Sequence, residues 1–97
     1  MATITFTAGT TTTVTDFTLS GTVGNLVTIN SSSPGTQFTL SKSSGTVTAS
    51  YMQIQDSNAT GGAAWNANDG TNVNLGNNTG WNFVAAVAIN GQFMAFF

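Results

Sequence analysis

Few residues in this chain could carry chemistry. The formally charged side chains are three carboxylates and one amine, namely Asp16, Lys42, Asp56 and Asp69. Histidine, cysteine, glutamate and arginine are missing, and with them the usual general bases and activated nucleophiles. A glycosidase would need two of the three aspartates flanking a sugar. We therefore expect a protein without catalytic residues, whose aspartates occupy surface or turn positions.

Two stretches offer hard oxygen ligands of the kind that Ca²⁺ accepts, DSNAT (residues 56–60) and NANDG (residues 66–70). Neither stretch has the carboxylate density of a strong metal site. Asx turns, in which the side chain bonds its own backbone two residues on, explain the same residue types. We expect no metal and no cofactor.

Three aromatic residues, Tyr51, Trp65 and Trp81, lie among asparagine, aspartate and glutamine. One interpretation is a platform on which a glycan stacks, with hydrogen-bonding neighbours. The other is that the two tryptophans bury their rings under loops rich in glycine and asparagine, with each N–H reaching a nearby loop carbonyl. Both interpretations stay open from the sequence.

The C-terminal residues form the strongest candidate for a partner-docking site. Phe93, Met94, Phe96 and Phe97 lie within five residues of the end. Burial of each side chain is worth roughly 1.5–3 kcal/mol. These side chains either complete the core of a small protein or dock on a neighbouring subunit. Side chains alternate in direction along a strand, so one face can serve the core and the other a partner.

Composition limits the class of protein. Ninety-seven residues fit one domain, here taken as residues 1–97. Threonine, asparagine and serine replace charge, while 40% hydrophobic residues in regular alternation argue against disorder. A net charge of −2 excludes an electrostatic grip on nucleic acid. We expect no membrane span and no signal peptide, because a long apolar run and a basic leader are both missing.

A triplet of apolar, polar and apolar residues recurs along the chain. Each triplet is a minimal unit with a period of two, which predicts a strand with its apolar side chains on one face. The copies are Ile4-Thr5-Phe6, Phe17-Thr18-Leu19, Val27-Thr28-Ile29, Phe38-Thr39-Leu40, Met52-Gln53-Ile54, Val73-Asn74-Leu75 and Trp81-Asn82-Phe83. Val47-Thr48-Ala49 is a weaker copy. Turn residues separate the copies, so an all-β fold is predicted.

The spacing of the triplets favours a short right-handed parallel β-solenoid. FTLS repeats at an offset of 21 and SGTV at an offset of 24, both near the length of one coil. In a solenoid, threonine and asparagine would form ladders outside while apolar residues stack inside. An antiparallel β-sandwich or jelly roll remains the alternative, since it has the same strand spacing. Open solenoid ends would expose strand edges, which are templates for pairing with other molecules.

The second half of the sequence differs from the first. Residues 57–82 are predicted to form long ordered loops around two short strands, 73–75 and 81–83. The segment 84–97 is predicted to form an apolar hairpin, with 84–89 and 92–97 joined by the turn signal Asn90-Gly91. We expect this hairpin to be used in assembly.

The stretch from Leu19 to Phe83 resembles β-rich modules of bacterial surface proteins and phage virion proteins. The matching pieces are GNLVTI, SSSPGTQ, TLSKSSGTV, DSNATGG and GNNTGW. The resemblance implies a right-handed β-helical segment without catalytic activity. It supplies no motif for chemistry, so no functional residue is carried over.

The resemblance also implies a place in the virion. A chain of one module plus an aromatic tail is similar to a capsid decoration (cement) protein or a small tail accessory protein. Its partner would be the major capsid protein or another virion protein. Copies are expected to self-associate, and a trimer suits the three-fold positions of a capsid. The alternative function is a tail-fibre module that binds a receptor or a carbohydrate.

Overall fold

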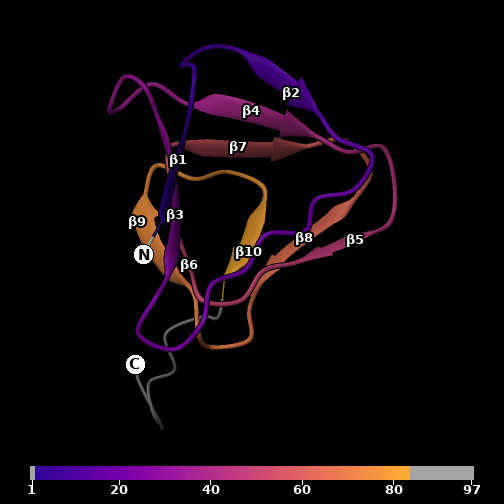
Figure 1. Cartoon of the computed structure of the whole chain (residues 1–97). Helices are drawn as coiled ribbons and strands as arrows, with labels where there is room; N and C mark the ends of the chain where they lie inside the picture. Colours follow the sequence, from indigo (N-terminus) through magenta and orange to yellow (C-terminus); the bar gives the residue numbers. More distant parts are fainter. Residues whose placement is uncertain (1, 84–97) are drawn as a thin grey trace, which may run out of the picture.

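The computed structural model describes residues 2–83, which wind into a β-solenoid with three parallel sheets (Figure 1). Sheet A forms one side and has the strand order β1 (Ala2–Phe6), β3 (Val27–Ser31), β6 (Met52–Gln55) and β9 (Val73–Gly76). Sheet B has the order β2 (Thr11–Thr13), β4 (Phe38–Ser41) and β7 (Ser57–Thr60). Sheet C has the order β5 (Thr46–Thr48), β8 (Ala64–Ala67) and β10 (Trp81–Phe83).

All ladders between these strands are parallel, so the short parallel β-solenoid is confirmed and the sandwich is wrong. The chain returns to sheet A once per coil. Ala2 pairs with Val27 and Val27 with Met52, each 25 residues on. Gln53 pairs with Val73, only 20 residues on, so the last coil boundary is shorter.

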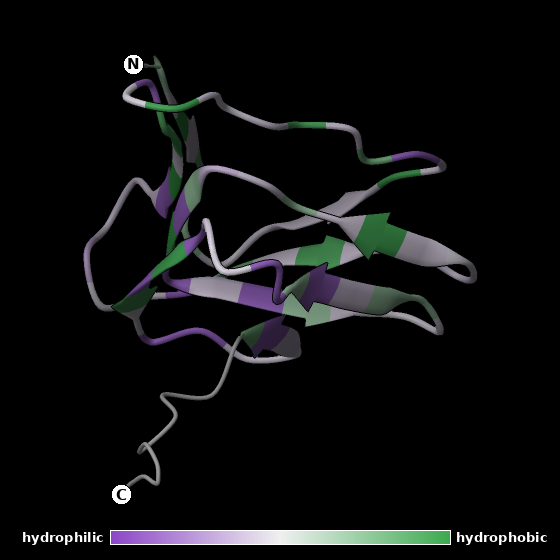
Figure 2. Ribbon diagram, turned by 90° about the horizontal axis from the view of Figure 1, so that it is seen from below, coloured by the Kyte–Doolittle hydropathy of each residue, from purple (hydrophilic) through white to green (hydrophobic). Residues whose placement is uncertain are grey.

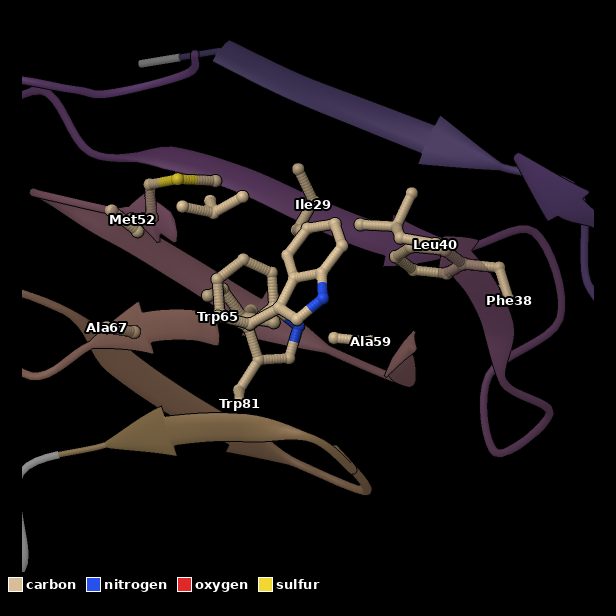
Figure 3. Packing of buried hydrophobic residues seen from close by; sticks show 11 residues of the cluster. Ile29, Phe38, Leu40, Met52, Ala59, Trp65, Ala67 and Trp81 are labelled. Atoms are coloured by element: carbon tan, nitrogen blue, oxygen red, sulfur yellow. The ribbon is translucent and has the colours of Figure 1, made fainter. Parts of the chain in front are cut away.

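The interior is a column of stacked apolar residues from the three sheets. Ile29 pairs in register with Ile54, and both are fully buried. Small residues in β7 leave room below the large residues of β4, because Phe38 pairs with Ser57 and Leu40 with Ala59. Trp65 and Trp81 fill the centre of the cluster, with Phe38 and Leu40 on one side of them and Met52 on the other (Figure 3).

Polar side chains form ladders along the outside, as predicted. Three contacts join successive coils: Thr5 Oγ1 donates to Asn30 Oδ1 (2.8 Å), Thr28 Oγ1 to Gln53 Oε1 (2.9 Å) and Asn82 Nδ2 to Asn66 Oδ1 (2.9 Å). Hydrophilic and hydrophobic residues alternate along the stacked strands (Figure 2). These ladders join the coils from outside while the apolar column joins them from within.

Two predictions about individual segments are wrong. Residues 57–82 are not mainly loop, since β7 and β8 lie there and belong to the third coil. Their sequences, SNAT and AWNA, are poor in strand-forming aliphatic residues, and the ladders to neighbouring coils hold them extended. Residues 17–19 form no strand, although Phe17 and Leu19 still pack against the core.

The sequence echoes that favoured a solenoid are not in structural register. The first FTLS places Phe17 against Trp65 of sheet C, with ring centroids 5.8 Å apart. The second FTLS is β4 of sheet B, where Phe38 stacks on Phe6. The copies of FTLS therefore lie on different sides of the solenoid, and the coil period is set by the ladders of sheet A instead.

Tight corners depend on glycine where successive coils touch. Gly80 has φ +81°, and a Cβ atom there would lie 2.0 Å from the backbone oxygen of Ala59 in the preceding coil. Gly70 has a similar φ of +90° but nothing within 4 Å. Substitutions at the two positions can therefore distinguish the energetic cost of a positive φ from that of the close contact between coils.

We predict that Gly80→Ala destabilises the fold by about 1–3 kcal/mol more than Gly70→Ala, because both variants strain φ but only the first overpacks a coil contact. Chemical denaturation of both variants checks this. Equal losses of unfolding free energy would show that the contact between coils at Gly80 is not tight.

Candidate interaction site at the ends of the solenoid

The N-terminal end exposes strand edges together with apolar residues. β1 and β2 are the edge strands of sheets A and B, and each pairs with one neighbour only. Ile4 is in register with the buried Ile29, yet it is 39% exposed because no described coil covers it. Phe6, Val14, Phe17 and Leu19 are also only partly buried against the core. This end is open and apolar.

In the last described coil, asparagine side chains take the place of backbone groups in bonding to the coil before it. The Asn72 amide accepts from the Met52 N–H (3.0 Å) and donates to the Ala49 carbonyl (2.9 Å). The Asn78 amide accepts from the Ser57 N–H (2.9 Å) and donates to the Ile54 carbonyl (2.7 Å). Backbone groups of the preceding coils thereby find side-chain partners where no backbone ladder bond reaches them. We refer to Asn72, Asn74 and Asn78 as the asparagine cap.

Asn74, the third member of the asparagine cap, contacts Asn78. Asn74 Oδ1 accepts from Asn78 Nδ2 (2.8 Å) and from the Gly76 N–H (2.9 Å). Asn74 pairs in register with the buried Ile54, so it takes a position that an apolar residue holds one coil earlier. The C-terminal end of the interior is therefore polar, in contrast to the N-terminal end.

Val73 of β9, in contrast, lies on the outer face of sheet A. Val73 pairs with Gln53, whose side chain accepts from Thr28 on the outer face of sheet A. Val73 is 39% and Leu75 is 42% exposed. Leu75 is the extra residue of a register shift, because Ile54 pairs with Asn74 and Gln55 with Gly76. The expectation that the apolar residues of Val73-Asn74-Leu75 face the interior is wrong for Val73, because Asn74 takes the inward position. An edge strand with outward apolar residues is a candidate docking surface.

Asp56 has a structural role at a corner between sheets A and B. Gly35, Asp56 and Asn77 all have positive φ, at +92°, +58° and +55°. The Asp56 carboxylate accepts from the Gly35 N–H (3.1 Å) and from Asn77 Nδ2 (2.7 Å). With 2% of its surface exposed, Asp56 holds three successive coils together rather than presenting a carboxylate to a substrate.

Asp69 holds a second corner, between the third and fourth coils. Its carboxylate accepts from the Thr71 N–H (3.0 Å), as the Asx turn predicts, and from the Thr71 hydroxyl (2.6 Å). It also accepts from the Ser50 hydroxyl and from Asn72 Nδ2. The hydrogen bond from Ser50, followed by those from Thr71, lowers the pKa of Asp69 below its usual value.

The two tryptophans belong to the core and not to a sugar platform. Trp65 is 2% and Trp81 is 8% exposed, and their rings meet edge to face at 5.2 Å. Trp65 Nε1 donates to the carbonyl of Thr60 (3.0 Å), the last residue of β7, and not to a loop carbonyl as the sequence suggested. Trp81 Nε1 donates to Ser57 Oγ (2.9 Å). Tyr51 is half-buried at a corner with φ +53°.

The remaining expectations concern the docking residues near the C-terminus and the absence of a metal site. Phe93, Met94, Phe96 and Phe97 lie outside the described residues, as does the expected hairpin 84–97. Within residues 2–83, no group of three or more acidic or metal-ligating residues is placed to hold a metal ion. The same part of the chain has no pocket and contains no helix long and apolar enough to cross a membrane.

No family model, curated protein or solved structure matched the chain when it was compared with each of these sets.

The asparagine cap was missed by sequence reasoning, although a signal for it exists. Once the 20-residue offset between β6 and β9 is known, Asn72 falls one coil after Met52, and Asn74 one coil after Ile54. Replacement of two core positions by asparagine marks the coil at which the interior ends. Without the offset, this region is simply a stretch rich in asparagine.

We predict that Asp69→Asn lowers stability at neutral pH and that its effect fades in acid. A folded-state pKa below the unfolded value adds stability above the unfolded pKa, and this stability is lost as the pH falls through the folded pKa. The difference in unfolding free energy between wild type and variant should therefore shrink below about pH 4. Denaturant unfolding from pH 2 to pH 7 measures it.

Asp16→Asn is the matched control, because no described residue forms a hydrogen bond with the Asp16 carboxylate. It should leave the free energy of unfolding close to that of the wild type. A constant gap between Asp69→Asn and wild type at all pH values would contradict the electrostatic role of Asp69.

Proposed function

We propose that this protein is a non-enzymatic structural protein of a phage particle, and specifically a decoration protein that stabilises the capsid by protein–protein contacts. The observation that carries the proposal is the edge of β9, which is unpaired among residues 2–83 and exposes Val73 and Leu75. The chain continues from the same last coil into residues 84–97, its most apolar segment. The exposed apolar residues of β9 and the apolar sequence of residues 84–97 together suit a docking surface.

The contact would combine backbone pairing with apolar burial. An edge strand offers unpaired N–H and carbonyl groups to a strand of another protein, and alternate side chains then supply specificity. Val73 and Leu75 would anchor the contact beside β9, and Phe93, Met94, Phe96 and Phe97 would extend it. The major capsid protein or another virion protein is the proposed partner, and the virion is the proposed location.

The body of the solenoid suits a part that must stay rigid on a particle surface. Successive coils are joined by ladders on three sides, by polar contacts outside and by the corners at Asp56 and Asp69. Threonine and asparagine present a neutral polar surface to solvent. The alternative, a carbohydrate-binding module, loses its platform because the rings of Trp65 and Trp81 are buried.

We predict that Val73→Lys weakens binding to particles roughly five- to tenfold, because it places a charge in the centre of the proposed contact. Val23→Lys is the matched control: Val23 is 75% exposed in the loop before β3, away from β9, and should bind normally. Co-sedimentation with phage particles assembled without this protein measures both. Equal binding by both variants would show that β9 is not part of the contact.

Deletion of residues 92–97 should abolish binding to particles while changing the thermal midpoint much less, because the proposed role of these apolar residues is to dock on a partner and not to complete the core. The same co-sedimentation, paired with thermal unfolding of the isolated protein, tests this. Truncated protein that still decorates particles normally would exclude a docking role for Phe93, Met94, Phe96 and Phe97.

Binding should also be nearly insensitive to salt, since the chain carries four formal charges and offers little for ions to screen. Co-sedimentation between about 0.05 M and 1 M sodium chloride checks this, a range over which the screening length falls severalfold. A steep loss of binding at high salt would show an electrostatic contact instead.

A further inference from the structure

The N-terminal edge strand β1 has a pattern that matches itself in reverse. Its sequence, Ala2-Thr3-Ile4-Thr5-Phe6, reads apolar, threonine, apolar, threonine, apolar in either direction. β1 pairs with β3 along one edge only, so its other edge is free within the described part of the chain. An antiparallel partner centred on Ile4 would meet this edge with the same pattern.

We infer that two copies of this chain associate head to head through β1. In this arrangement Ile4 faces Ile4 of the second copy, and Thr3 faces Thr5. The inner faces would form one apolar column, because Ile4 already stacks over Ile29 and Ile54 in successive pairings. The outer faces would continue the threonine ladder, since directly opposed threonines pair favourably across antiparallel strands.

The difference between the two ends decides for this geometry against a fibre. Head-to-tail stacking would set the apolar residues Ile4 and Phe6 of one copy against the asparagine cap of the next. The cap has already used its amides on the carbonyls of Ala49 and Ile54. An isologous contact instead places the identical N-terminal ends of two copies together, and the assembly is complete with two copies.

Charge also fits a second copy. Residues 1–15 carry no formally charged side chain, and Asp16 is the first in the chain. Two identical ends can therefore meet without repulsion, whereas a strongly charged partner would find no counter-charge there. The inference does not rest on the proposed capsid contact, which uses the opposite end and β9.

The test uses charge swaps on the outer face of β1. Thr3→Lys combined with Thr5→Lys places like charges directly opposite each other in a homodimer. Thr3→Asp combined with Thr5→Asp does the same with the opposite sign. Sedimentation velocity of the full chain over a concentration series should show a monomer–dimer equilibrium for wild type. Each double variant should raise the dissociation constant about tenfold or more.

An equimolar mixture of the two double variants should restore the dimer, because lysine then faces aspartate. This rescue separates a broken interface from a damaged fold, and far-ultraviolet circular dichroism of each variant checks the fold directly. Val73→Lys with Leu75→Lys makes the same charge change on β9 and should leave the dimer intact. Loss of particle binding by this control, with the dimer retained, would distinguish the two proposals.

A single cysteine locates the two-fold axis, because the chain has none of its own. Ile4→Cys should form a disulfide-linked dimer under mild oxidation, and Leu75→Cys should not. A wild type that stays monomeric, a trimer in sedimentation, or failure of the mixed charge variants to associate would each overturn the inference.

Discussion

The structure depends on one constraint, the parallel register that places each residue over its counterpart in the next coil. Ladders on three sides fix this register, and each strand is too short to hold it alone. Buried backbone groups must find partners, and here they find them one coil away. Side chains of one type then stack, as Ile29 does on Ile54, because the register of the backbone determines which side chains are neighbours.

The same constraint explains why so little charge is needed. Stacked charged side chains of one sign would repel at the short spacing between coils, whereas threonine and asparagine both donate and accept hydrogen bonds. Thr5 on Asn30 and Asn82 on Asn66 show this exchange. Asp56 is tolerated because its carboxylate accepts from Gly35 and Asn77, on the coils around it.

Sequence patterns predicted several strands well, since β3, β4 and β6 coincide with apolar triplets. They failed at β7 and β8, where tertiary ladders override weak local preference. At β9 they predicted the strand but not which face its side chains occupy, because this depends on a register that no local pattern contains. The docking residues Phe93, Met94, Phe96 and Phe97 remain a prediction, and the described coils contribute Val73 and Leu75 independently.

The first and last described coils of the solenoid differ. In the last described coil, the amides of Asn72 and Asn78 bond backbone groups of the coil before it, and Asn74 brings a polar side chain to the position that Ile54 holds one coil earlier. At the first coil, no such substitution occurs, and Ile4 continues the interior column into an open edge. The described interior is therefore apolar at one end and polar at the other. In the proposed assembly, the apolar N-terminal ends of two copies join each other, and the exposed residues of β9 are left for a different partner.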